Sequence, residues 1–331
     1  MLTRREWMMA ASLGSFGANI DMARAADSQD WPTRPIHLTV PLPPGGSIDF
    51  YGRAIAEPMA QRLGQPVVVE NRSGADGRIA MSYLARQPAD GYSLAVVSLT
   101  NAIHPALFKD MPYDVVRDFE PIGFIAASPM VLLVGPAAEG VTSVAELVRA
   151  ARNRPGKVTY GSSGNGTPFH LASVLLASLA NVQMQHVPYR GTAQLMQALL
   201  AGDVWFGSVS VGPYLPQITV GRLKALATTL PEGRLPILPA VPTLNEALGV
   251  DTLTLISWIG LMARAGVPPN VVARYSSELR ATVNDSEFVK NKLEPQGYQA
   301  MTATPAQMGA ILQSDIRRFA QVAHEAHITA D

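Results

Sequence analysis

Strand-like and helix-like segments alternate along almost the whole chain, and this alternation is the strongest constraint on the fold. Apolar segments at residues 36–40, 67–69 and 93–98 read as strands, and residues 48–62 and 77–86 between them read as amphipathic helices. A strand, helix, strand order places consecutive strands side by side and parallel. The pattern therefore predicts an α/β fold with mostly parallel sheets, whose ligands bind at the carboxyl ends of the strands.

A second series of the same kind begins beyond Ile122. We expect strands at residues 130–134, 158–160, 185–187, 204–206 and 223–228. Helices are expected from a cap at Thr142 or Ser143 to residue 153, at 168–180 and at 193–201. Residues 231–242 contain four prolines and predict an irregular surface loop. Two further helices are expected at residues 271–283 and 305–323.

Two such series followed by a returning pair of helices predict two lobes joined by two chain crossings. The apolar runs at residues 122–130 and 255–262 are the candidate crossings. We assign residues 33–126 and 258–331 to lobe 1 and residues 127–257 to lobe 2. A double crossing forms a hinge, with a ligand cleft between the lobes.

The N-terminus has the features of a secretory signal peptide. Arg4 and Arg5 precede a short apolar stretch at residues 8–20, and Ala23-Arg24-Ala25 offers small residues for cleavage. The arginine pair makes residues 1–25 Tat-like, and the apolar stretch is too short to span a bilayer. We therefore expect cleavage near Ala25 and a periplasmic mature protein without a lipid anchor.

Composition excludes several classes of function. Lys and Arg together number 26, as do Asp and Glu, so no basic field favours nucleic acid or a membrane surface. The chain has no Cys, which excludes disulfides, thiolate zinc sites and a cysteine nucleophile. GxSxG and HExxH motifs are absent, and the 6 His residues show no metal-ligand spacing. We expect a protein that is not an enzyme and needs no metal or cofactor.

The segment Pro43-Pro44-Gly45-Gly46-Ser47-Ile48-Asp49 lies between the first strand and the first helix. Its glycines allow close backbone approach, and Ser47 is a suitable helix cap. The N–H groups of a helix start bind anions without a basic side chain. A tight turn between strand and helix is the equally favoured alternative. Asp49 is expected to accept N–H groups of the loop or to meet an amino or hydroxyl group of a ligand, and Arg53 to be its i,i+4 partner.

A second glycine-rich segment, residues 160–170, also joins a strand to a helix. Thr167 is expected to cap that helix, with Pro168 at its first position. Because each lobe has one such loop, we expect the two loops to clamp a carboxylate between them.

Residues outside the two loops have weaker assignments. His104 follows the third strand and is expected to reach the cleft or to cap a helix. Arg190 offers a positive charge on a third loop, whereas His170 and His186 are expected to be structural and Trp205 and Trp258 to lie in the core. The expected ligand-binding residues are Pro44, Gly45, Gly46, Ser47, Asp49, Ser98, Asn101, His104, Ser162, Gly164, Asn165, Gly166, Thr167, Tyr189, Gly191 and Thr192.

Short motifs occur along the chain in a characteristic order. They are Pro35-Ile36, Pro44-Gly45-Gly46 with Asp49, Val69-Glu70-Asn71-Arg72 with Gly74-Ala75, Ala89-Asp90-Gly91-Tyr92, Pro112-Tyr113-Asp114 with Asp118-Phe119, Tyr160-Gly161-Ser162 with Gly166 and His170, His186-Val187-Pro188-Tyr189, Val241-Pro242-Thr243 and Ser257-Trp258. From Pro35 to about Ile328 the sequence resembles the Bug family of periplasmic solute receptors, the binding components of tripartite tricarboxylate transporters. The resemblance implies a type II periplasmic-binding-protein fold with a Venus-flytrap cleft. It also implies that backbone groups and ordered water hold the ligand's carboxylate.

Three features depart from the family pattern and leave the ligand open. Trp205 stands where the family usually has Asp, Arg190 where it tends to have Lys, and residues 207–212 are unusually small and apolar. The expected function is capture of a dicarboxylate, amino acid or aromatic acid, by a monomer, for the membrane components of a tripartite tricarboxylate transporter. The alternatives are a co-receptor for a sensor kinase, and a hydrolase or isomerase, which would need an activated residue.

The arginine pair generates a prediction about export. A Tat translocon recognises the pair itself, whereas a Sec translocon requires only positive charge. Changing Arg4→Lys together with Arg5→Lys should leave the precursor unprocessed in the cytoplasm, as measured by fractionation and immunoblotting. Normal periplasmic accumulation of the double variant would rule out Tat export.

Overall fold

Two mixed β-sheets form the framework of the computed structural model, which describes residues 31–251 and 255–325. The predicted signal peptide, residues 1–25, lies outside the described residues. The 6-stranded first sheet has the order β11-β4-β10-β3-β1-β2, and the 5-stranded second sheet has the order β7-β6-β8-β5-β9. The strands are β1 (Ile36–Val40), β2 (Val67–Asn71), β3 (Ser93–Ser98), β4 (Phe119–Pro129), β5 (Val131–Val134), β6 (Thr159–Ser162), β7 (Gln185–Pro188), β8 (Phe206–Val209), β9 (Lys224–Thr228), β10 (Ile256–Arg264) and β11 (Gln299–Ala300).

Parallel pairing is confined to part of each sheet. β1 pairs in parallel with β2 and β3, and β6 pairs in parallel with β7 and β8. β10 is antiparallel to β3 and β4, and β5 is antiparallel to β8 and β9. The α/β architecture is confirmed, but the sheets are mixed because β10 and β11 in the first sheet and β5 in the second run opposite to the other strands.

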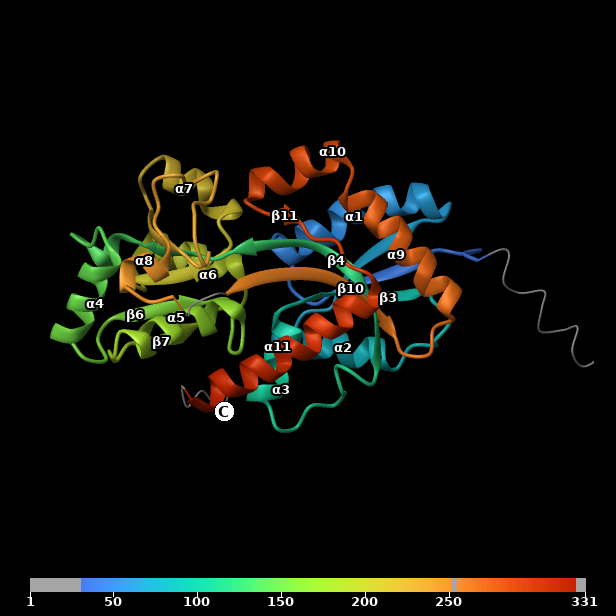
Figure 1. Cartoon of the computed structure of the whole chain (residues 1–331), viewed down its shortest axis with the longest axis horizontal. Helices are drawn as coiled ribbons and strands as arrows, with labels where there is room; N and C mark the ends of the chain where they lie inside the picture. The colour runs from blue at the N-terminus through green and yellow to red at the C-terminus, as the bar shows by residue number, and fades with distance from the viewer. Residues whose placement is uncertain (1–30, 252–254, 326–331) are drawn as a thin grey trace, which may run out of the picture. The chain divides into compact units, whose positions relative to one another are not determined.

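The chain passes between the two sheets twice, once at the end of β4 and once at the start of β10, and these two strands pair with each other. β4 and β10 pair antiparallel over their full lengths, from Ile256 opposite Pro129 to Arg264 opposite Phe119. The chain enters the second sheet directly after β4 and re-enters the first sheet at β10 (Figure 1). The predicted crossings coincide with these two strands. The lobe limits, which fall within them, stay a prediction.

Helices cover both faces of each sheet. On the first sheet, α1 (Ser47–Leu63) and α9 (Pro269–Val283) lie on one side, and α2 (Arg78–Ala85), α3 (Thr100–Leu107) and α11 (Pro305–Glu325) lie on the other (Figure 1). The second sheet has α4 (Val144–Asn153), α5 (Pro168–Leu179), α6 (Thr192–Ala201), α7 (Leu215–Thr219) and α8 (Leu244–Leu248) around it. The short helix α10 (Ser286–Phe288) precedes β11.

Strand β5 shows how the sequence specifies this layering. Its four residues are all buried, and alternate side chains point to opposite faces of the sheet. Leu132 and Val134 pack in a cluster with α4, whereas Val131 and Leu133 pack in a separate cluster with α6. A continuous apolar run is what a strand covered on both faces requires.

Three local predictions need correction. Ser47 is not the cap of α1 but its first residue. The N-cap is Gly46, whose backbone is extended, and no side chain caps this helix by a hydrogen bond. The strand expected at residues 204–206 lies at Phe206–Val209. The proline-rich loop is irregular as expected, but it is not wholly a surface loop. Its Leu235 and Leu238 are 3% and 8% exposed because they pack in the α6 cluster.

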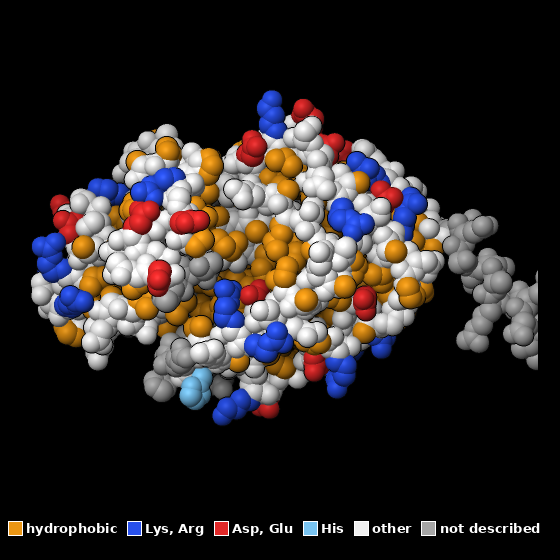
Figure 2. Space-filling view, in the orientation of Figure 1, with side chains coloured by type: hydrophobic (Ala, Val, Ile, Leu, Met, Phe, Trp, Pro, Cys, Tyr) orange, Lys and Arg blue, Asp and Glu red, His pale blue; other side chains and the backbone are white. Residues whose placement is uncertain are grey.

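The surface carries no large field of one sign on the face that Figure 2 shows, where acidic and basic side chains are interspersed. This agrees with equal totals of 26 basic and 26 acidic residues. Among the described residues, no helix is both long and apolar enough to cross a membrane.

Close packing of α11 on β10 predicts unequal effects of two glycine substitutions. A Cβ at Gly260 would lie 2.8 Å from the carbonyl oxygen of Gly123 and 2.9 Å from Met308 Cε of α11. We expect Gly260→Ala to lower the free energy of unfolding by about 1–3 kcal/mol through overpacking. The measurement is the urea midpoint by circular dichroism.

Gly309→Ala is the matched control on α11. A Cβ there would meet Pro121 Cγ at 3.7 Å, which is ordinary contact, and alanine favours a helix interior over glycine by about 1 kcal/mol. The control should unfold at the same or a higher urea concentration. Equal urea midpoints for the wild type and Gly260→Ala would show that the protein accommodates a Cβ at residue 260 without loss of stability.

Candidate functional site

A cavity lies where the carboxyl ends of strands from both sheets meet. From the first sheet its wall includes Pro41 after β1, Ser98 at the end of β3 and Ser257 at the start of β10. From the second sheet it includes Ser163 directly after β6 and Ser210 directly after β8. The water-accessible volume is about 50 Å³, whereas a single water needs about 10–15 Å³. The cavity is therefore suited to a small molecule.

Four helices begin at this wall, namely α1, α3, α5 and α6. Their first turns contribute Ser47, Asn101, Thr167 and Thr192 to it. The N-terminus of a helix carries a partial positive charge and N–H groups without helical partners. Among the described residues that line the cavity, none is Lys, Arg or His. The attraction for an anion therefore comes from backbone dipoles and from hydroxyl and amide groups.

Asn101 presents an amide donor to the cavity. Its Oδ1 accepts the N–H of Ser98 at 3.0 Å, which fixes the orientation of the amide group. Only 7% of the residue is exposed, and no hydrogen-bond partner of Nδ2 is found within residues 31–251 and 255–325. Since Asn101 lines the cavity, Nδ2 is available to a bound oxygen.

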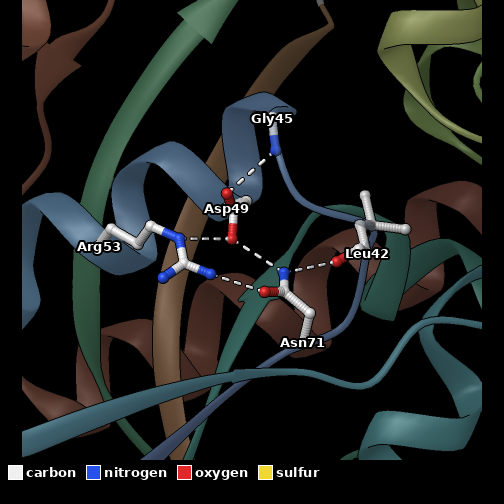
Figure 3. A network of polar contacts seen from close by, with 5 residues as sticks. All are labelled: Leu42, Gly45, Asp49, Arg53 and Asn71. Atoms are coloured by element: carbon white, nitrogen blue, oxygen red, sulfur yellow. Dashed lines mark hydrogen bonds and ion pairs between the residues drawn. The ribbon is translucent and has the colours of Figure 1, made fainter.

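Asp49 holds the first loop in place, as Figure 3 shows. Its carboxylate accepts the N–H of Gly45 at 3.0 Å, Arg53 Nε at 3.0 Å and Asn71 Nδ2 at 2.8 Å. Asn71 Nδ2 also donates to the carbonyl of Leu42 at 2.9 Å, which joins the loop to β2. Burial opposes ionisation, but the hydrogen bonds from Arg53, Asn71 and Gly45 outweigh it and lower the pKa of Asp49. The expected contacts with the loop and with Arg53 are present, and Asp49 does not line the cavity.

The second loop is organised by its own hydroxyl groups. Thr167 caps α5, with Oγ1 accepting the N–H of His170 at 3.3 Å, and Pro168 is the first helical residue, both as predicted. Ser162 Oγ and Thr167 Oγ1 each donate to the carbonyl of Gly164 at 2.9 Å. Gly166 has φ +70°, and a Cβ there would lie 3.0 Å from Leu107 Cδ1 of α3. Glycine at this position therefore lets the loop approach the first sheet's helices closely.

Of the three histidines near the site, His104 and His170 are buried and His186 is partly buried, and in each the pKa is lowered so that the ring is neutral. His104 is 1% exposed and packs edge-on against Phe108, and burial lowers its pKa to about 3. Neither of its ring nitrogens has a hydrogen-bond partner in the described part of the chain. His170 and His186 stack at 3.9 Å between ring centroids, and burial lowers their pKa values to about 4 and about 3. None of the three lines the cavity, which agrees with structural roles for His170 and His186.

The structure divides the expected site residues into three groups. Ser47, Ser98, Asn101, Thr167 and Thr192 line the cavity. Gly191 lines an adjoining, more open pocket with Arg190. The remaining expected residues lie in or near the supporting loops and α3 without lining the cavity wall: Pro44, Gly45, Gly46, Asp49, His104, Ser162, Gly164, Asn165, Gly166 and Tyr189.

Several lining residues were not expected from the sequence. Tyr298 follows the α10 region and donates or accepts a hydrogen bond with Ser210 at 2.8 Å, which links the C-terminal region to the end of β8. The small residues at 207–212 were the only sequence signal for Ser210. Asp76 lies in the loop after β2. The reasoning that selected Ser47, in the loop after the first strand, could therefore also have selected Asp76. The unexpected lining residues with polar side chains are Asp76, Thr100, Ser163, Ser210, Ser257 and Tyr298.

Comparisons with known proteins find a matching family model and similar solved structures. Residues 51–328 match the model of the tripartite tricarboxylate transporter family receptor. The structure of the R. palustris protein Rpa4515 with adipate has a TM-score of 0.85 and 34% identity, covering 91% of this chain and 99% of that one. The periplasmic binding protein BugD has a TM-score of 0.83 and 30% identity, with coverages of 90% and 99%. MatC from Rhodopseudomonas palustris with bound malate has a TM-score of 0.81 and 28% identity, with coverages of 88% and 99%.

The family match covers most of the chain, and the solved structures cover nearly all of the described residues. The predicted resemblance to the Bug receptors and the periplasmic-binding-protein fold are thus confirmed. This chain belongs to the tripartite tricarboxylate transporter receptor family, a family of periplasmic binding proteins.

Proposed function

We propose that this protein captures a small carboxylate in the periplasm and delivers it to the membrane components of a tripartite tricarboxylate transporter. The observation that carries the proposal is the meeting of four helix N-termini, α1, α3, α5 and α6, at one small cavity whose described lining residues include no Lys, Arg or His. Such a site favours a single negative group over a sugar, and it lacks the cationic side chains that polyphosphates require. Relatives solved with adipate and malate support a carboxylate.

We infer that the protein binds its ligand without chemical change. In the part of the chain that the structure describes, one Ser–His hydrogen bond is present, with Ser162 Oγ 2.7 Å from His186 Nε2. Ser162 is fully buried, its hydroxyl donates to the carbonyl of Gly164, and it does not line the cavity. The pair therefore supports the loop and does not provide a nucleophile that a substrate could reach.

Ligand entry requires the two sides of the cavity to separate. Ser210 and Tyr298 form a hydrogen bond across it, and Gly166 approaches α3 on another side. We propose a hinge motion at the two chain crossings, which opens these contacts to admit the ligand and restores them around it.

A thermal-shift panel tests the ligand class. A ligand at about 100 times its Kd adds about 2.7 kcal/mol to stability, which raises the melting temperature by several degrees. We expect such a rise with a dicarboxylate, an amino acid or an aromatic acid, and none with its amide or ester analogue, because the loss of charge weakens the hydrogen bonds. Shifts with sugars or nucleotides, in the absence of any carboxylate response, would overturn the proposal.

Asn101 provides a sharper test of how the carboxylate is held. Asn101→Asp keeps an oxygen to accept the Ser98 N–H but replaces the Nδ2 donor with a negative oxygen. Loss of a hydrogen bond to a charged group costs about 1.5–3 kcal/mol, so we expect calorimetry to show at least about a tenfold weaker affinity.

Arg190→Ala is the control for this experiment. Arg190 is exposed and lies at the adjoining pocket, so its removal should cost about 1 kcal/mol or less. A larger loss in Arg190→Ala than in Asn101→Asp would indicate that a side-chain cation, and not the helix N-termini, holds the anion.

A further inference from the structure

Asp76 is the one carboxyl group among the described residues that line the cavity. It lies in the turn Ala75–Gly77 after β2. Its φ is +53°, a backbone conformation that residues other than glycine adopt at a cost in energy. The turn therefore keeps an aspartate where glycine would be less strained. Strained residues of this kind are concentrated at functional sites.

The side chain of Asp76 reaches the loop that follows β6 in the second sheet. Its Oδ1 would lie 2.2 Å from a Cβ at Gly164, which has φ +140° and belongs to the loop after β6. Asp76 also lines the adjoining open pocket, together with Ser163. The carboxyl group thus stands at the partition between the cavity and the adjoining, more open pocket.

Among the described residues, none neutralises this carboxyl group through a hydrogen bond or ion pair. Within residues 31–251 and 255–325, Asp76 has no hydrogen bond or ion pair, and burial raises its pKa. Arg78 opposes that rise from a distance, but its Nε donates to the carbonyl of Ala75 at 3.1 Å. The guanidinium carbon of Arg78 lies 3.5 Å from the ring centroid of Phe108, so this cation is engaged elsewhere.

A carboxylate ligand therefore meets two opposed influences in this cavity. The helix N-termini attract its negative charge, and Asp76 repels any second negative charge placed near the partition. A ligand with a positive group at that end would satisfy both. An ammonium supplies the charge and up to three hydrogen-bond donors for the unpaired carboxyl oxygens.

We propose that Asp76 binds the ammonium group of the ligand, so that this receptor selects zwitterionic amino acids over carboxylates that lack an ammonium. The proposal rests on the carboxylate-binding function proposed above. Asp76 is then the specificity-determining residue, while the helix starts hold the carboxylate that all candidate ligands share.

The test uses pairs of ligands that differ only in the ammonium group. Calorimetry measures the affinities of alanine and propionate, aspartate and succinate, and glutamate and glutarate for the full-length mature protein. In the wild type we expect the amino acid of the best-binding pair to bind at least about tenfold more tightly than its partner. In Asp76→Asn this preference should fall to within about threefold, mainly because the amino acid binds more weakly.

Two further variants keep the result interpretable. Asp76→Gly removes the carboxyl group while fitting the positive φ, so it replaces Asp76→Asn if that variant unfolds at a lower temperature. Glu139→Gln makes the same change of charge at an exposed residue outside the cavity and should keep the wild-type preference.

The outcomes separate the two proposals. An unchanged preference in both Asp76 variants, or a wild type that binds succinate or glutarate as tightly as the amino acids, overturns the role of Asp76 while leaving carboxylate binding intact. Tighter binding of the dicarboxylates by the wild type than by Asp76→Gly would also overturn it, because a protonated Asp76 would then be donating to a second carboxylate. Binding of sugars or nucleotides in the absence of any carboxylate binding overturns the proposed function itself.

Discussion

The direction of the strands determines where the helix N-termini of this protein meet. A strand that leads through a short loop into a helix places the start of that helix at the strand's carboxyl end, as α1 follows β1 and α5 follows β6. In both sheets the parallel pairs bring these ends to one edge, and the two edges meet at the cavity. The positive ends of the helix dipoles therefore meet there because of how strands and helices are connected, and this effect of the backbone does not depend on particular side chains.

This origin of the field explains the roles of the charged side chains. Asp49 carries a negative charge near the start of α1, yet it stabilises the loop because Gly45, Arg53 and Asn71 surround it. Its charge is neutralised locally, and the N-terminus of α1 remains attractive to anions. Asp76 differs because its oxygens have no such donors in the described chain. Two aspartates close to one cavity thus have different electrostatic effects, set by the number of donors around each.

Much of the framework could be predicted from local sequence. Alternating apolar segments gave the strands β1 to β3 and β5 to β7, and the Thr167-Pro168 pair gave the start of α5. Features that depend on distant residues could not be obtained in this way. Nothing near Tyr298 indicates that it meets Ser210, because the contact joins segments 88 residues apart. Likewise, the apolar run at β10 does not indicate that this strand pairs antiparallel with both β3 and β4, because tertiary packing decides the pairing.

The position of β10 within the first sheet also sets an order of assembly. The second sheet is built from one continuous segment, β5 to β9, and has all its strands once residue 228 has been synthesised. The first sheet has β10 between β3 and β4, so its two parts have no ladder to join them until residue 264 is present. A nascent chain that stops between these points has all the strands of the second sheet, whereas β3 and β4 of the first sheet both lack the neighbour that β10 provides. During the interval in which the ribosome adds these residues, β3 and β4 therefore each present an unpaired edge to which another chain can pair.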